Sequence, residues 1–137
     1  MHMRLLLLGG GSALGQSLIS QGAEEGISFL APRPPEDGWD AASLTQLMDE
    51  TRPDAVVNLA YYFDWFQSDS VDEARFAFQQ RAVERLAGLC NHLDAILLQP
   101  SSYRVFDGAR ATAYSEKDEQ IPCGKRGQAL LKIEQVV

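Results

Sequence analysis

The sequence predicts an α/β protein with a Rossmann-like, doubly wound parallel sheet of about five strands and helices on both faces. Three observations predict this fold: short apolar runs alternate with helical patterns, these runs are almost wholly apolar, and the first of them ends in a glycine-rich turn. Strands of a parallel sheet are covered on both faces, so they need no polar alternation. The 137 residues are expected to form one domain, residues 1–137, with a core of its own.

The elements follow in order along the chain. The first strand is expected at residues 3–8, with later strands at 27–31, 55–60 and 95–99. Spacing of apolar residues predicts helices over 12–21, over 41–51 with Asp40 as its N-cap, and over 71–93, where Cys90 is interpreted as part of the core. A proline-rich loop, 31–38, follows the second strand. An aromatic cluster at 61–66 follows the third, where it either lines a ligand site or packs under a loop.

The turn after the first strand carries the clearest functional signal. Gly9, Ser12 and Gly15 fit a GxxGxxG pattern with one substitution, whereas a GxGxxG pattern counted from Gly9 and Gly11 would need glycine at Leu14. Backbone N–H groups at the start of a helix can face an anionic diphosphate. The turn therefore predicts a dinucleotide site made by Gly9, Gly11, Ser12, Ala13, Leu14 and Gly15. The alternative is a glycine-rich strand-to-helix turn that binds nothing.

Composition narrows the possible partners. The net charge of −7 argues against a nucleic-acid-binding surface. Cys90 and Cys123 lack metal-ligand spacing, so we expect no metal and a reducing, cytoplasmic location. Every apolar run, including residues 5–8, is much shorter than the roughly 20 residues of a membrane span, and the first residues lack the cleavage region of a signal peptide. We therefore expect no membrane association.

Residues 4–15, 52–62 and 101–108 are similar, in order and spacing, to segments of the dTDP-4-dehydrorhamnose reductase family of extended short-chain dehydrogenase/reductases, within the NAD-dependent epimerase/dehydratase superfamily. The second segment resembles the family's RPDxVxNxAAY and the third its STDYVFDG. The resemblance implies an NAD(P)H-dependent reduction of a dTDP-4-keto-deoxysugar or a similar sugar nucleotide. It also implies that Asp37, in a DxxD pattern, lies near adenine, that Ser102 is the catalytic serine, and that four residues line the cofactor: Asn58, Leu59, Ala60 and Tyr62.

The sequence departs from this family where the chemistry is done. The family uses a tyrosine as acid and a lysine four residues later, and the resemblance puts Arg126 and Leu130 at these positions. A guanidinium is a poor acid near neutral pH, and leucine carries no charge. No YxxxK occurs anywhere in the chain. The active site is thus degenerate, which leaves three alternatives: a reductase with a different acid, a non-catalytic dinucleotide-binding sensor or complex subunit, and a vestigial site.

The choice of cofactor rests on the end of the second strand. Arg33 lies just beyond it, where an arginine can face a 2′-phosphate, and no acid directly ends the strand to hold a free ribose hydroxyl. These features favour NADP(H), and NAD(H) remains possible because Asp37 is near. The alternative is that Arg33 is only a solvated loop residue.

Members of the family continue past this point with a substrate-binding lobe, so the resemblance covers their N-terminal part only. For this chain it implies that the strand at 95–99 is an uncovered edge. It also implies that the apolar residues of the last predicted helix are exposed to solvent; they are Leu130, Leu131, Ile133, Val136 and Val137. We expect either a missing C-terminal segment or a second copy of the chain to cover both.

Overall fold

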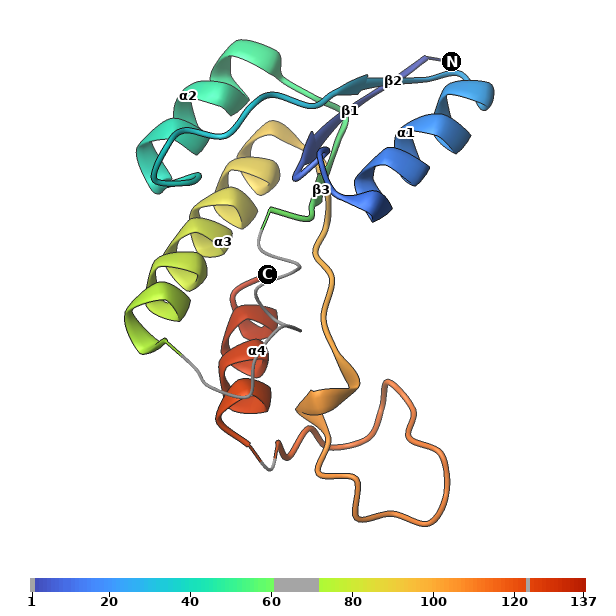
Figure 1. The fold of residues 1–137 in the computed structure, drawn as a ribbon, viewed down its shortest axis with the longest axis vertical. Helices are drawn as coiled ribbons and strands as arrows, with labels where there is room; N and C mark the ends of the chain where they lie inside the picture. Colours follow the sequence, from blue (N-terminus) through green and yellow to red (C-terminus); the bar gives the residue numbers. More distant parts are fainter. Residues whose placement is uncertain (1, 61–71, 123) are drawn as a thin grey trace.

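The computed structural model describes residues 2–60, 72–122 and 124–137, and these contain a four-stranded parallel sheet. The strands are β1 (Met3–Leu8), β2 (Ile27–Leu30), β3 (Ala55–Asn58) and β4 (Ile96–Leu98), in the spatial order β2-β1-β3-β4. The chain moves outward from β1 to β2 and then returns to the other side of β1 with β3 (Figure 1). The predicted doubly wound α/β fold is confirmed, with four strands in the described part of the chain where about five were expected.

Helices cover both faces of this sheet (Figure 1). On one face lies α1 (Ala13–Glu24), and on the other lie α2 (Ala41–Thr51) and α3 (Glu73–Leu93). The last helix, α4 (Lys125–Gln135), packs beside α3 and against a short 3-10 turn, η2 (Tyr103–Val105). Together with the long loop between η2 and α4, it extends the molecule beyond the sheet (Figure 1).

The apolar run that forms β1 is buried on both faces. Leu6 and Leu8 enter the core formed with α2, α3 and α4, whereas Leu5 and Leu7 pack on the side of α1. Successive side chains of a strand point to opposite faces. Because both faces of this central strand are covered, apolar side chains are needed at consecutive positions, and the four leucines supply them. Burial of each such side chain contributes roughly 1.5–3 kcal/mol.

Local signals set most of the element boundaries. Ser12 caps α1, and Asp40 caps α2 as predicted, its carboxylate accepting the Ser43 N–H at 2.8 Å. The first helix continues three residues past its predicted end, because Gly22 packs directly under the Phe29 ring of β2 instead of ending the helix. The third strand ends early at Asn58, whose side-chain oxygen accepts the Ala60 N–H at 3.2 Å and turns the chain out of the ladder.

Among residues 2–60, 72–122 and 124–137, β4 is the outermost strand, so the predicted uncovered edge is confirmed there. Ile96 is 58% exposed and Leu98 is 55% exposed. Both share a face with Ala55 and Val57 of β3, the face on which α1 lies, yet α1 packs over β1 and β2 and leaves β4 open. This exposed area is therefore an uncovered part of the sheet's face as well as its edge.

The expectation for the last helix was wrong. Leu130 is 1% exposed and Ile133 is 2% exposed, because α3 and the residues after η2 cover this side of α4. Leu131 and Val136 are half-buried, and only Val137 of the apolar set is exposed. The main apolar stripe of α4 is thus buried within this chain.

Cys90 lies in the core, as the sequence indicated. It is 2% exposed on α3, and burial raises the pKa of its thiol to about 11. The thiol is consequently inert while the fold is intact. Cys123 lies outside the described residues. In the part of the chain that the structure describes, no helix has the length and apolar character that crossing a bilayer requires.

Candidate functional site

The candidate site lies at the carboxyl ends of β1 and β3, where the order of the strands reverses. The backbone of Gly9 has φ +84°, and a Cβ there would lie 2.6 Å from the carbonyl carbon and oxygen of Leu59. Leu59 in turn donates its N–H to the Leu8 carbonyl at 2.8 Å. The loops after β1 and β3 therefore touch at the switch point, which in open α/β sheets is the place of the ligand crevice. Only glycine fits at position 9.

The turn after β1 leads into α1 with its backbone amides arranged for an anion. Ser12 donates its hydroxyl to the Gly9 carbonyl at 2.9 Å and accepts the Gly15 N–H at 3.0 Å. Ser12 thus serves as the cap of the helix. The N–H groups of Ala13 and Leu14 have no carbonyl acceptor within the helix, and both residues are exposed. Gly15 is buried beneath them, with the Gly9 carbonyl 2.8 Å from where its Cβ would be.

A hollow of about 680 Å³, here called the Gly11 hollow, opens in front of this turn. A Cβ on Gly11 would meet no protein atom within 4 Å, so no packing inside the protein requires glycine there. The hollow places Arg33, from the loop after β2, opposite the glycine turn. Its lining combines the loops after the first three strands and comprises Gly9, Gly10, Gly11, Ser12, Gln16, Ala31, Pro32, Arg33, Pro34, Leu59 and Ala60.

A second hollow of about 540 Å³, the Trp39 hollow, continues from the first and shares Gly9, Pro34 and Ala60 with it. Asp37 lines it together with two aromatic side chains, the 7%-exposed Trp39 and the half-buried Phe78 of α3. Arg75, one turn before Phe78, lies at its rim. Glu36 is a second acid in the lining, and apolar rings beside acidic and basic groups are suited to a flat, polar-edged group such as a purine.

The predicted site residue Asn58 faces the protein. Its side-chain amide donates to Gln99 Oε1 at 2.7 Å and accepts from Ala60 N–H, and the residue is 4% exposed. Asn58 therefore fixes the positions of Leu59 and Ala60, which do line the Gly11 hollow. Tyr62 and the rest of the aromatic cluster at 61–66 lie outside the described residues.

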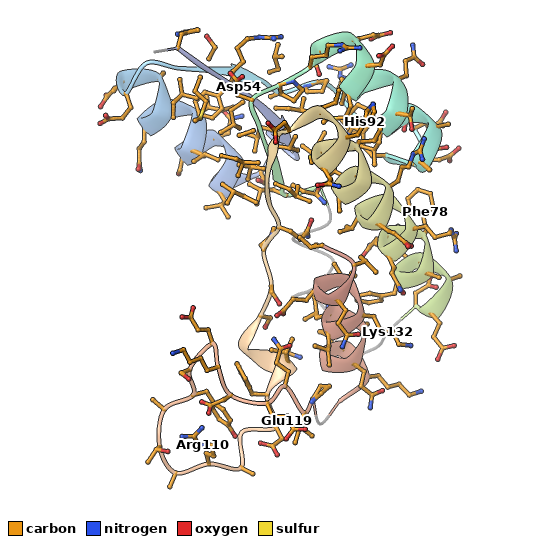
Figure 2. The ribbon with its side chains drawn as sticks, turned by 180° about the vertical axis from the view of Figure 1, so that it is seen from behind. Asp54, Phe78, His92, Arg110, Glu119 and Lys132 are labelled. Atoms are coloured by element: carbon orange, nitrogen blue, oxygen red, sulfur yellow. The ribbon has the colours of Figure 1, made fainter. Side chains whose placement is uncertain are left out.

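The amino-terminal part of the segment 52–62 has a different role. Asp54 accepts the Arg4 N–H on its carboxylate at 2.8 Å and donates its own N–H to the Arg4 carbonyl at 2.9 Å, which joins the starts of β1 and β3. Arg52 ends α2 in a left-handed conformation. These residues lie at the amino ends of the strands, away from both hollows, and Figure 2 shows Asp54 at the opposite end of the molecule from the loop that carries Arg110 and Glu119.

Ser102 lies beyond β4 and lines neither hollow. It is half-buried, and its hydroxyl accepts the Arg104 N–H at 3.2 Å. The two positions that the resemblance assigned to tyrosine and lysine are both buried: Arg126 is 5% exposed, with its guanidinium carbon 6.0 Å from the centroid of the Phe76 ring, and Leu130 belongs to the core. Nothing charged occupies the second of these positions.

Several lining residues escaped the sequence analysis, among them Gln16, Arg75 and Phe78. Gln16 donates its side-chain amide to the Gly10 carbonyl at 2.5 Å and so stiffens the glycine turn; its spacing of four residues from Ser12 was the available signal. Arg75 and Phe78 are three residues apart on α3, a spacing that places them on one side of the helix. Phe78 packs at the edge of the core and also lines the Trp39 hollow.

Comparison with known proteins defines the family. Residues 3–137 match the family described as RmlD substrate binding domain. The chain belongs to this family. This RmlD-family domain is 32% identical over 139 residues to a dTDP-4-dehydrorhamnose reductase of Mycobacterium tuberculosis, covering 98% of this chain and 45% of that protein. The resemblance found in the sequence is thus confirmed, and the domain spans about half the length of the curated relatives it matches.

Solved structures show the same fold for this RmlD-family domain. A dTDP-4-dehydrorhamnose reductase of Bacillus anthracis, solved in complex with NADP, superposes with a TM-score of 0.85 at 21% identity, over 100% of this chain and 49% of that one. The enzyme WbmG of Bordetella bronchiseptica, solved with NAD and UDP, gives a TM-score of 0.72 at 19% identity, over 99% of this chain and 49% of that one. Each neighbour is about twice as long.

Proposed function

We propose that this domain binds NAD(P)(H) and is the cofactor-binding part of a sugar-nucleotide reductase-like protein. The observation that carries the proposal is the contact of Gly9 with Leu59 at the switch point of the sheet, directly behind the Gly11 hollow. Relatives named dTDP-4-dehydrorhamnose reductase support a nucleotide-linked keto-deoxysugar as the substrate of the whole protein. The reducing cytoplasm that the cysteine content favours is part of the same proposal.

The glycine turn is the proposed diphosphate site. With Ser12 bound to Gly15, the N–H groups of Ala13 and Leu14 remain at the positive end of α1 and can each donate to a phosphate oxygen. The space in front of Gly11 admits the phosphate close to the backbone. Asp37 and the rings of the Trp39 hollow are proposed to hold the adenine.

Arg33 supports NADP(H) over NAD(H). It lines the hollow that contains the glycine turn, and its guanidinium can bind a 2′-phosphate through two parallel hydrogen bonds. Asp37 lines the neighbouring hollow and is separated from Arg33 by two prolines, Pro34 and Pro35. The proposed site thus offers a cation near the expected ribose position, with the acid further along the loop.

The buried Leu130 favours a second candidate function, a dinucleotide-binding module without catalysis. In the family's reaction a lysine lowers the pKa of the acid and holds the ribose, and the side chain at this position of the chain is enclosed in the core. Such a module could be a sensor or a subunit of a complex. A C-terminal segment outside this sequence or a second copy of the chain is the proposed cover for β4.

Calorimetric titration with NADPH and NADH tests cofactor binding. We expect both to bind, with NADPH the tighter, and we expect Arg33→Ala to weaken NADPH about tenfold or more while leaving NADH nearly unchanged, because only the former loses a charge-assisted contact. Arg81→Ala is the matched control, since Arg81 is exposed on α3 outside the lining of both hollows. Absence of binding by either nucleotide contradicts the proposal.

Turnover separates the two candidate functions. Oxidation of NADPH in the presence of dTDP-4-keto-deoxysugars, lost in Ser102→Ala and retained in Arg126→Ala, supports a reductase that uses another acid. Tight NADPH binding without oxidation, in this chain and in any longer form of the protein, supports the binding module.

A further inference from the structure

The glutamine that follows β4 is joined to the end of β3 by a hydrogen bond between side chains. In the ladder of these two strands Val57 pairs with Leu98, so Asn58 and Gln99 are the next neighbours along the chain. Asn58 donates from Nδ2 to Gln99 Oε1 at 2.7 Å, and Asn58 is 4% exposed. Gln99 is absent from the lining of the Gly11 hollow and of the Trp39 hollow. Any effect of Gln99 on the proposed cofactor site therefore passes through Asn58.

The backbone of the loop after β3 fixes the orientation of both amides. Asn58 Oδ1 accepts the Ala60 N–H at 3.2 Å. If the Asn58 amide were flipped, its NH2 group would face the Ala60 N–H, and two donors would oppose each other. The oxygen of Asn58 is therefore directed to Ala60 and its nitrogen to Gln99, so Gln99 must present its own oxygen as the acceptor.

This arrangement leaves the nitrogen of the Gln99 amide without an acceptor. Gln99 Nε2 is buried and has no hydrogen-bond partner among residues 2–60, 72–122 and 124–137. An unpaired buried N–H group costs free energy. An apolar side chain such as that of Leu97, two residues earlier and packed against the core, would avoid this cost. The part of the Gln99 side chain that the fold uses is thus the oxygen that holds Asn58.

The loop that Asn58 holds forms the wall behind the Gly11 hollow. Leu59 and Ala60 both line this hollow, and Leu59 donates its N–H to the Leu8 carbonyl at 2.8 Å. Because a Cβ on Gly9 would lie 2.6 Å from the Leu59 carbonyl carbon, the glycine turn and this loop are in direct contact. A displacement of Leu59 or Ala60 would consequently move the wall against which the cofactor is proposed to lie.

We propose that Gln99 is a positioning residue of the cofactor site. By accepting the Asn58 N–H, it keeps the Asn58 oxygen on the Ala60 N–H and the loop after β3 against the glycine turn. Gln99 lies three residues before Ser102, so the end of the strand that leads to the candidate catalytic serine also sets the shape of the cofactor hollow. The part of this inference that concerns binding rests on the proposed function.

Amide hydrogen exchange, followed by NMR on the isotopically labelled protein, tests the positioning without a ligand. Gln99→Met keeps an unbranched side chain and removes the acceptor, so the Ala60 N–H should exchange about fivefold faster relative to Val56 in the ladder of β3. Gln99→Glu offers an oxygen to Asn58 in either protonation state and should restore slow exchange. Unchanged relative exchange at Ala60 in Gln99→Met overturns the inference.

A measurement on the original chain decides the matter where Gln99→Met does not fold. If the Asn58 side chain is held as proposed, its Nδ2 protons should exchange with water much more slowly than those of the exposed Gln128 on α4. Equal exchange of the two side-chain amides overturns the inference.

Calorimetric titration with NADPH tests the consequence for binding. We expect Gln99→Met to weaken NADPH about fivefold and Gln99→Glu to recover most of the affinity. Gln128→Met removes an amide from an exposed position of α4, and Leu89→Ala removes packing at the edge of the core on α3; both should leave the affinity unchanged. The second control shows whether lower stability alone weakens NADPH. An unchanged NADPH affinity in Gln99→Met overturns the inference.

The two kinds of measurement separate this inference from the proposed function. If the original chain binds no NADPH, the proposed function fails, and exchange at Ala60 still decides whether Gln99 positions the loop. If NADPH binds and Gln99→Met changes neither the exchange nor the affinity, Gln99 only fills space and the proposed function stands.

Discussion

Two glycines in the turn after β1 differ in role: Gly9 is needed for the fold, and Gly11 borders the proposed ligand site. Gly9 is required by the protein itself, since its φ of +84° and the Leu59 backbone exclude a side chain. Gly11 meets no such neighbour. Two glycines two residues apart in one loop therefore have different physical reasons to be there, one internal to the fold and the other at the surface of the Gly11 hollow.

This difference gives a paired prediction. Gly9→Ala is expected to lower the free energy of unfolding by about 2 kcal/mol or more, because it combines a left-handed backbone with a clash against main-chain atoms. Gly11→Ala should change stability by less than about 0.5 kcal/mol and should weaken NADPH, because its methyl group enters the hollow. Urea unfolding and calorimetry measure the two effects.

A Gly11→Ala variant that binds NADPH as tightly as the original chain would show that the nucleotide does not approach the backbone at this point. A Gly9→Ala variant of unchanged stability would show that the two loops can separate at little cost.

At the scale of elements, α4 shows why the family's catalytic pair cannot simply be restored. Its stripe of Leu130 and Ile133 is enclosed by α3 and by residues after η2. A helix that supplies core side chains at a given position cannot also present a charge there to a ribose. The degenerate sequence of this helix is therefore coupled to its packing.

We expect Leu130→Lys to destabilise the protein by more than about 3 kcal/mol, because it combines the loss of a buried leucine with the burial of an ammonium group. The matched control is Gln128→Lys, which adds the same charge at an exposed position of α4 and should change stability by less than about 0.5 kcal/mol. Urea unfolding measures both. A stable Leu130→Lys protein would mean that α4 can rotate.

The helices and strands also show which features of the fold could be predicted from the sequence. Strands and helices were predictable where the signal is local, as with the Asp40 cap and the leucines of β1. The burial of α4 was missed because it depends on α3, more than thirty residues away along the chain. The role of Phe78 was missed for a related reason: its own helix gives no sign that Trp39 and the proline-rich loop lie opposite.

At the scale of the whole molecule, the sheet that the described residues form ends in an open strand, β4. Ile96 and Leu98 of β4 are both more than half exposed, on the face that α1 leaves uncovered. Unpaired N–H and C=O groups on the outer side of such a strand are a template for another strand. Apolar side chains beside a free edge favour association between chains.

We therefore expect this chain, studied by itself, to self-associate as its concentration rises. Leu98→Lys should shift sedimentation equilibrium toward the monomer, because a charge on the open face opposes strand pairing. Ile121→Lys is the control, since Ile121 is comparably exposed in the loop before α4 and away from β4. A monomer at every concentration tested would contradict the expected need for a cover over β4.

The rate at which the buried thiol of Cys90 is alkylated reports how often this molecule opens. Only a thiolate reacts with alkylating reagents, and with a pKa of about 11 inside the core this sulfur stays silent until α3 lifts away. In a Cys123→Ser variant, Cys90 is the one remaining cysteine, so the labelling rate measures how often the protein leaves its native state. A nucleotide that binds only the folded protein should lower the labelling rate, and a tighter nucleotide should lower it more at the same concentration. The labelling rate thus measures how much of the protein has nucleotide bound, without a dye or a substrate.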